Sequence, residues 1–460
     1  MSTRRAPLAA ELLAVAVVAV LFGGPGRDVD AGQAARPNIV IIFADDLGYG
    51  DLASYGHPTI RTPRLDRMAA EGVRLTSFYV ASPSCSPSRA ALLTGRYPIR
   101  TGVNVALGPE SQIGLPDEEV TLAEALGRAG YRTAIVGKWH LGSQPAMNPL
   151  NHGFDRYFGL LYSNDMIRPW VGTDRPLELY RDRAPVEHPV DQSTLTERYT
   201  EEAVAFIREN RDQPFFLYLP HSMPHVPLAV SERFRGRSAA GLYGDVIESL
   251  DWSTGVVLDT IAELGLDDRT LVIFTSDNGP WAAMPDRMFA GDMIKPWDAG
   301  SSGPLRGSKA SSWEGGVRVP FLARWPGRIR AGTETGALVT ALDVLPTVLA
   351  ATGVPLPPGR RLDGYDVTAA LTGDGPSPRT EFFYLNDGRL EAVRDGRWKL
   401  RVVRAGEEGV TAELFDLDVD PYERSDRASR EPETLDRLAA RMRQFAAETG
   451  AATAADRLRR

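Results

Sequence analysis

Residues 38–46 read Asn-Ile-Val-Ile-Ile-Phe-Ala-Asp-Asp, an apolar run rich in β-branched residues that ends in two adjacent carboxylates. A continuous run of this kind is typical of a parallel strand that is buried on both faces. In open α/β sheets, ligands bind beyond the carboxyl ends of the strands, where Asp45 and Asp46 are expected. Two adjacent carboxylates repel each other unless a cation neutralises them, and their hard oxygens suit Ca²⁺ or Mg²⁺. For this pair alone, an acidic turn in solvent remains an alternative.

A second buried strand is predicted where residues 270–276 read Thr-Leu-Val-Ile-Phe-Thr-Ser, and it is followed directly by Asp277 and Asn278. The ends of the two strands together offer three carboxylates and one amide. Two strand ends with hard oxygen donors favour one divalent metal site over two separate acidic turns.

The segment from residue 36 to residue 374 alternates strand and helix patterns, which predicts an α/β domain. Further buried strands are expected at residues 131–136 and 215–219, and amphipathic helices at residues 196–210 and 243–264. Three stretches carry neither a motif nor a clear period, and we interpret them as insertions that set substrate specificity: residues 104–113, 166–195 and 280–303.

The pattern changes at about residue 375. Asp395-Gly396 is a hairpin turn signal between residues 390–394 and 397–400, and residues 414–417 read as another strand. Apolar side chains then recur at helical spacing, at Leu435, Leu438, Met442 and Phe445. Residues 375–460 are therefore predicted to form a smaller C-terminal α+β subdomain, with an antiparallel sheet and a helix.

Composition limits the function classes. The chain has 460 residues and a formal net charge of −8, which argues against a broad nucleic-acid-binding surface. An anionic substrate would have to be attracted by local cations, against the overall charge. The single cysteine allows no disulfide within the chain.

The N-terminal residues resemble an export signal. Arg4 and Arg5 precede an uncharged run at residues 12–22, which is too short to span a bilayer comfortably, and small residues that suit cleavage follow. Residues 1–35 are thus predicted to be a signal peptide, with a membrane anchor as the alternative, and no stable membrane insertion is expected. The chain also lacks Asn-x-Ser/Thr sites, so we expect export to a bacterial periplasm or to the exterior.

The only cysteine begins a compact motif. Residues 85–96 read Cys-Ser-Pro-Ser-Arg-Ala-Ala-Leu-Leu-Thr-Gly-Arg, and a short helix is expected to end near Gly95. A sulfur at the start of a helix, with Arg89 one turn on, lies in an environment that favours an anion or a reactive centre. An unpaired cysteine is most often a small buried apolar residue, and this alternative stays open for Cys85 taken alone.

Other cations and histidines follow predicted strands. Lys138 and His140 come after the strand at 131–136, and their spacing points both side chains to one side of an extended segment. His225 follows the strand at 215–219, in a loop that prolines at 224 and 227 would stiffen.

The pattern C-x-P-S-R-x-x-x-L-T-G-R from Cys85 to Arg96 resembles, over its full length, the signature of the formylglycine-dependent (type I) sulfatases. The stretches at 114–124, 137–142, 277–279 and 313–318 look closest to the arylsulfatase A and N-acetylgalactosamine-6-sulfatase branch of that family. The resemblance runs from about Pro37 to about Glu423. It implies an alkaline-phosphatase-like sulfatase fold, with a large mixed sheet flanked by helices.

The resemblance also implies the roles of residues. Cys85 would be oxidised to formylglycine (3-oxoalanine) by a formylglycine-generating enzyme, and Arg89 would support that group. One Ca²⁺ would be bound by Asp45, Asp46, Asp277, Asn278 and an oxygen of the modified Cys85. Lys138 and Lys309 would bind the sulfate together with Ser163, while His140 would assist the formylglycine hydroxyl and His225 would face the leaving group.

The implied activity is hydrolysis of an aryl or carbohydrate sulfate ester. One hydroxyl of a hydrated aldehyde attacks sulfur, and the other then expels sulfate as the aldehyde re-forms, which avoids a second attack at sulfur. A divalent cation and two lysines would stabilise the anionic transition state. Two alternatives stay open: a phosphonate or phosphate monoester hydrolase on the same scaffold, and a non-catalytic protein that binds sulfated glycans. The sequence names neither the ester nor the oligomeric state.

Overall fold

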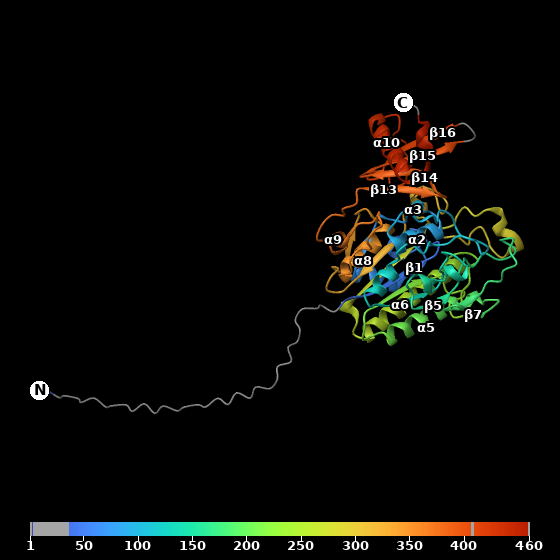
Figure 1. Ribbon diagram of the computed structural model, residues 1–460, viewed down its shortest axis with the longest axis vertical. Helices are drawn as coiled ribbons and strands as arrows, with labels where there is room; N and C mark the ends of the chain where they lie inside the picture. The colour runs from blue at the N-terminus through green and yellow to red at the C-terminus, as the bar shows by residue number, and fades with distance from the viewer. Residues whose placement is uncertain (1, 3–35, 406–408, 459–460) are drawn as a thin grey trace. The chain divides into compact units, whose positions relative to one another are not determined.

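The computed structural model describes residues 2, 36–405 and 409–458, and a ten-stranded sheet lies at its centre (Figure 1). The order of strands across this sheet is β11-β2-β10-β9-β1-β8-β4-β5-β6-β7. The strands are β1 (Asn38–Ala44), β2 (Val73–Leu75), β4 (Arg132–Val136), β5 (Arg156–Gly159), β6 (Leu179–Arg181), β7 (Ala184–Glu187), β8 (Phe215–Pro220), β9 (Thr270–Ser276), β10 (Phe321–Arg324) and β11 (Thr333–Thr335). A short pair, β3 (Phe78–Tyr79) and β12 (Val339–Thr340), forms a separate two-stranded sheet.

Strand β1 is the central element that positions the site. All seven of its residues are buried, as the apolar run predicts for a strand covered on both faces. It pairs in parallel with β8 on one side and β9 on the other, with Ala44 opposite Ser276. Because β1 and β9 end level with each other, Asp45 and Asp277 leave the sheet at the same edge.

The sheet is mixed, as predicted. Strands β9, β1, β8, β4 and β5 run parallel, whereas β10 runs antiparallel to both β9 and β2. At the other edge, β6 and β7 form an antiparallel hairpin next to β5.

This hairpin corrects one expectation, because residues 166–195 are not irregular throughout. No strand pattern in the sequence indicated β6 and β7, since both are very short and β7 is a mostly exposed Ala-Pro-Val-Glu with no buried alternate positions. The pairing of β6 with β5 extends the sheet, so this part of the segment is a framework element.

Helices cover both sides of the sheet, and Figure 1 shows α2 and α8 on one side of β1 and α5 and α6 on the other. A capping box begins α4 (Leu122–Arg128), because the Glu124 backbone N–H donates to the Thr121 hydroxyl at 3.0 Å and the Thr121 N–H donates to the Glu124 carboxylate at 2.9 Å. The helices are α1 (Pro63–Glu71), α2 (Cys85–Thr94), α3 (Pro98–Thr101), α4 (Leu122–Arg128), α5 (Leu195–Glu209), α6 (Gly241–Glu263), α7 (Glu314–Val317), α8 (Val344–Thr352), α9 (Thr368–Thr372) and α10 (Pro432–Thr449).

The C-terminal residues form a second sheet with α10, as predicted. The hairpin at Asp395-Gly396 is confirmed, with Asp395 opposite Trp398. The strands are β13 (Glu381–Asn386), β14 (Arg389–Asp395), β15 (Trp398–Ala405) and β16 (Gly409–Asp416), with β17 (Ala452–Thr453) parallel to β14. The domain boundary at residues 374 and 375 stays a prediction.

The predicted signal peptide at residues 1–35 lies, apart from residue 2, outside the described residues. Within the ranges that the structure does describe, no helix is both long enough and apolar enough to cross a bilayer.

A buried ion cluster joins the second sheet to the segment that begins α7. Lys399 on β15 lies 3.0 Å from a carboxylate oxygen of Glu314 and 2.7 Å from one of Glu423, and all three side chains are fully buried. Burial raises the pKa of Glu314, but Lys399, together with Arg318 and Arg394, lowers it to about 2. Burial raises the pKa of Glu423 to about 7, against the opposing effect of Lys399. Lys399 therefore contacts two buried carboxyl groups from separate segments, and Arg318 adds a second cation 3.5 Å from Glu314.

We expect Lys399→Met to lower the free energy of unfolding by about 3–5 kcal/mol, because it leaves Glu423 buried without its cation and leaves Glu314 with only the more distant Arg318. Arg437→Met is the matched control. Its ion pair with Asp395 is exposed, so its loss should change stability by only about 0–1 kcal/mol. Guanidinium unfolding of the two variants measures the difference, and equal midpoints would contradict a structural role for the buried cluster.

Candidate active site

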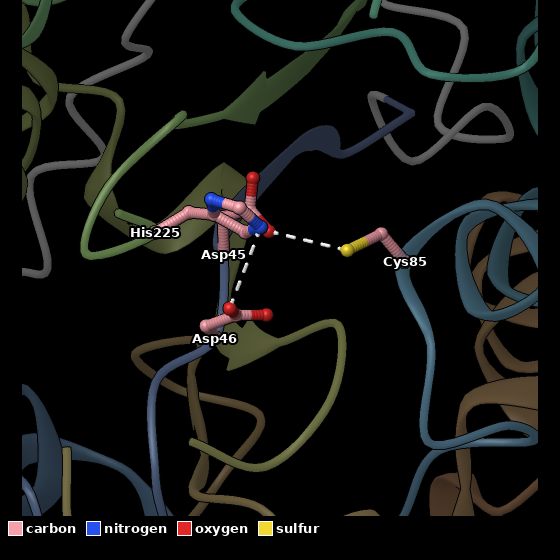
Figure 2. A group of neighbouring side chains, drawn as sticks. All are labelled: Asp45, Asp46, Cys85 and His225. Atoms are coloured by element: carbon pink, nitrogen blue, oxygen red, sulfur yellow. Dashed lines mark hydrogen bonds and ion pairs between the residues drawn. The ribbon is translucent and has the colours of Figure 1, made fainter. Parts of the chain in front are cut away.

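Four side chains from three parts of the chain converge at the carboxyl end of β1 (Figure 2). Asp45 and Asp46 follow β1, Cys85 begins α2, and His225 lies in the loop after β8. All four are buried, and one potential ligand atom of each lies within 4.8 Å of the others. The end of β1, the start of α2 and the loop after β8, each of which carries residues proposed from the sequence, therefore lie side by side.

The backbone turns sharply between the two aspartates. Asp46 has a φ of 67°, in the left-handed region that aspartate tolerates better than most residues, and its N–H donates to the Asp277 carboxylate at 3.0 Å. The turn separates the two carboxylates. Asp45 faces Lys138 and Cys85, whereas Asp46 faces Lys309.

Arg89 crosslinks three segments. From α2, its Nε and Nη2 donate to one oxygen of Asp277 at 3.1 and 2.8 Å, and its Nη1 donates to the backbone carbonyl of Lys138 at 2.8 Å. Its side chain is fully buried, and Asp45 lies 3.5 Å away. Burial lowers the pKa of Arg89, but Asp277 and Asp45 outweigh burial and raise it, so the guanidinium stays charged.

Two lysines complete the charge balance. Lys138 Nζ donates to Asp45 at 2.5 Å and to the Ser163 hydroxyl at 3.0 Å. Lys309 Nζ donates to the two oxygens of Asp46 at 2.7 and 2.9 Å and lies 3.3 Å from Cys85 Sγ. With Arg89 and Asp277, three carboxylates thus face three cations.

The surroundings shift the pKa values of Asp45 and Asp277 in opposite directions. Burial raises the pKa of Asp45, but Lys138 and Arg89 outweigh burial and lower it below its usual value. Burial raises the pKa of Asp277, and the neighbouring Asp45 carboxylate raises it further. Additional positive charge at this site would therefore favour the ionised form of Asp277.

The thiol of Cys85 differs from the expectation. Burial raises its pKa well above the usual value, and the nearby Lys138 and Lys309 only partly oppose this effect. The start of α2 therefore does not favour a thiolate nucleophile. The helix itself is as predicted and ends at Gly95, which has a φ of 67° and donates its N–H to Ala91.

The two histidines have different environments. His140 Nε2 lies 2.9 Å from the Leu107 carbonyl, to which it can only donate, and its buried Nδ1 has no hydrogen-bond partner in the described parts of the chain. Burial lowers the pKa of His140 well below its usual value, and Lys138 and Arg89 lower it further. His140 is therefore neutral, with Nδ1 as a free acceptor.

His225 instead directs a ring nitrogen into the cluster. Its Nδ1 lies 2.6 Å from the Val226 carbonyl and must donate to it, so Nε2 points toward Asp46, 3.6 Å away (Figure 2). In this orientation Nε2 can carry a proton into the site only when the ring is an imidazolium.

The predicted metal ligands fit a hard divalent cation. Asn278 Nδ2 donates to Asp46 at 2.7 Å, and its Oδ1 is buried without a hydrogen-bond partner among the residues described. A buried amide oxygen with unused lone pairs, beside the carboxylates of Asp45, Asp46 and Asp277, is the donor chemistry that Ca²⁺ and Mg²⁺ prefer.

Trp281 lies beside two of the predicted site residues, although no sequence motif marks it. Its ring centroid lies 5.4 Å from that of His225, and Lys309 Nζ lies 4.5 Å from it. The available signal was an aromatic residue two positions after the Asp277-Asn278-Gly279 strand end. The segment at 280–303 was expected to face the substrate, but nothing in its sequence distinguished Trp281 from its other large side chains.

Two family profiles and several curated proteins match this chain. The family profile described as "Sulfatase" matches residues 37–354, and the one described as "N-sulphoglucosamine sulphohydrolase, C-terminal" matches residues 308–448. N-acetylgalactosamine-6-sulfatase of Canis lupus familiaris is 41% identical over 80% of this chain and 72% of that protein. Arylsulfatase A of Homo sapiens is 42% identical over 81% of this chain and 76% of that protein.

The fold is also similar to solved structures. PsFucS1 sulfatase from Pseudoalteromonas sp. aligns with a TM-score of 0.80 at 30% identity and covers 92% of each chain. This similarity confirms the alkaline-phosphatase-like fold that the sequence resemblance implied.

Replacing Arg89 should destabilise the protein in a graded way. Arg89→Lys keeps the positive charge but loses the planar guanidinium that donates to both Asp277 and the Lys138 carbonyl. We expect it to lower the free energy of unfolding by about 1–3 kcal/mol. Arg89→Met leaves Asp277 buried without its partner and should cost about 3–5 kcal/mol. Urea unfolding tests the order of the two variants, and stability equal to that of the unsubstituted protein in both would refute the crosslinking role.

Proposed function

The chain belongs to the sulfatase family, and we propose that it hydrolyses an aryl or carbohydrate sulfate ester with a formylglycine made from Cys85 and a bound Ca²⁺. The observation that carries this proposal is the convergence of Lys138, Lys309 and the three carboxylates on Cys85. The leaving-group classes follow from the relatives, which are named for aryl sulfates and for a sulfated sugar.

The cations match the charge of the substrate. A sulfate ester is an anion, and it must enter a site where Lys138 and Lys309 are already paired with Asp45 and Asp46. Lysine presents a compact charge that suits a tetrahedral oxyanion, and Ser163 adds a hydroxyl beside Lys138 at 3.0 Å. These three side chains are proposed to hold the sulfate group.

The calcium ion is proposed to bind Asp45, Asp46, Asp277 and Asn278, with an oxygen of the modified Cys85 as a further ligand. When bound, it supplies positive charge that stabilises the transition state of an anionic ester. The free Oδ1 of Asn278 and the raised pKa of Asp277 support a cation at this position.

The encoded thiol is proposed to be a precursor. A formylglycine-generating enzyme would convert the Cys85 side chain to an aldehyde, in a two-electron oxidation for which that enzyme supplies the oxidant. The carbon–sulfur bond breaks, the sulfur leaves as sulfide, and a carbonyl oxygen from water or the oxidant takes its place. The hydrated aldehyde supplies one hydroxyl to attack sulfur and a second to expel sulfate. The raised pKa of Cys85 supports this reading, because the unmodified thiol is a poor nucleophile here.

The protein is also proposed to be exported to a periplasm or to the exterior, on the basis of the sequence of residues 1–35.

The histidines would move protons. His140 is neutral and offers a free Nδ1, so it can accept a proton from a hydroxyl at position 85. As an imidazolium, His225 can donate the proton on Nε2 to the departing oxygen. A phenol needs this donation little, whereas a sugar alcohol needs it strongly because its alkoxide is a poor leaving group.

The modification of Cys85 is the first test. In active protein, we expect the peptide that contains residue 85 to be about 18 Da lighter than the encoded peptide, and sulfate release to rise with the modified fraction. Cys85→Ala should lower sulfate release by about a thousandfold or more. The assay uses a panel of sulfated sugars, an aryl sulfate and a phosphonate monoester. Full activity with an unmodified thiol would overturn the formylglycine proposal, and turnover of the phosphonate alone would favour the phosphonate hydrolase.

Metal removal is the second test. A chelator should abolish sulfate release, and added Ca²⁺ should restore it and raise the thermal midpoint. Asp46→Asn should increase the Ca²⁺ concentration needed for half of either effect by about tenfold or more. Asp268→Asn, an exposed carboxylate near the amino end of β9, is the control and should leave both effects unchanged. Activity that survives complete chelation would argue against the metal.

A further inference from the structure

We propose that Trp281 is a specificity-determining residue, which forms a platform for a ring carried on the ester oxygen of the substrate. This assignment rests on the proposed sulfatase function and identifies the part of the pocket that contacts the leaving group. The ring can be a sugar or an arene, since both present a flat or nearly flat apolar surface to an indole.

The position of Trp281 follows from two distances. Lys309 Nζ lies 4.5 Å from the centroid of the indole and 3.3 Å from Cys85 Sγ, so the cation proposed to bind sulfate touches both the indole and the reacting position. The ring of His225 lies 5.4 Å from the same indole. A sulfate held at Lys309, with its ester oxygen at His225, therefore places the group on that oxygen against Trp281.

Trp281 is held firmly in this place. The Lys309 backbone N–H donates to the Pro280 carbonyl at 2.9 Å, which ties the residue before Trp281 to the residue that binds the sulfate. A separate apolar cluster lies next to Trp281 and is formed by Trp170, Val226, Met288 and Ile294, all 4% exposed or less. Trp281 packs against this cluster but is itself only half-buried.

The contact would act on binding more than on chemistry. Trp281 carries no charge and does not ionise, so its proposed role is contact with the ring of the substrate and not proton transfer. It can bury apolar surface of a ring in the ground state and the transition state alike, which lowers KM and leaves kcat nearly unchanged. Inorganic sulfate carries no ring, so its Ki should not depend on Trp281.

The test uses the full-length protein with Cys85 modified and verified by mass. Sulfate release is measured for a monosaccharide sulfate and for 4-nitrophenyl sulfate, together with the Ki of inorganic sulfate. We expect Trp281→Ala to raise KM for ring-bearing esters by about 5–50-fold, to change kcat by less than about threefold, and to leave the Ki of sulfate unchanged. Trp281→Phe should retain most of the affinity.

Trp325→Ala is the matched control. Trp325 is also half-buried, but it follows β10 at the end of the sheet away from Asp277, so its loss should leave KM and Ki unchanged. Thermal midpoints of the variants check that each is folded, and Trp281→Leu, which keeps an apolar side chain, replaces Trp281→Ala if the latter does not fold.

Each outcome decides the assignment. A rise in KM for the sugar ester, the aryl ester or both supports the platform and names the ring that it accepts. An unchanged KM overturns it, and so does an equal rise in KM and in the Ki of sulfate, because that result shows that Trp281 only positions Lys309 and His225. If the unsubstituted protein releases no sulfate from any ester, the proposed function fails, and this assignment fails with it.

Discussion

The contact between Arg89 and Asp277 is the constraint on which the site depends. Both side chains are fully buried, and the guanidinium joins α2, the end of β9 and the segment after β4. A buried carboxylate is tolerated only when its charge is compensated and its lone pairs are used. The same carboxylate also receives the N–H of Asp46, so the arginine fixes the turn that separates Asp45 from Asp46. The position of Cys85 follows as well, because Cys85 lies on the helix that carries Arg89.

Much of this arrangement was predictable because it follows from local pattern. Continuous apolar runs identified β1 and β9, and the parallel register then brings Asp45 and Asp277 to one edge. The hairpin at Asp395-Gly396 and the capping box at Thr121 depend on neighbouring residues only. Cys85 could be singled out only by the motif around it, because hydrophobic periodicity says nothing about the role of a single cysteine.

The features that escaped prediction depend on tertiary contacts. Strands β6 and β7 are ordered by pairing with β5, although their own sequences carry no alternation. Trp281 is recognised as part of the pocket only by its distances to His225 and Lys309, which are far away in sequence. The raised pKa of Cys85 is the result of burial, and burial outweighs the helix start and the two lysines that favour a thiolate. Local sequence reports which charges are near a group but not how completely water is excluded from it.

The balance of charge connects the metal to substrate binding. Lys138 and Lys309 are the cations best placed for a sulfate group, yet each donates to a carboxylate at 2.5 to 2.9 Å. An anionic ester must therefore compete with Asp45 and Asp46 for both lysines. A divalent cation bound to those carboxylates would remove this competition, because the carboxylates would then be compensated without the lysines. Metal binding and substrate affinity are thus expected to be linked, with the lysines available to sulfate only when another cation neutralises the aspartates.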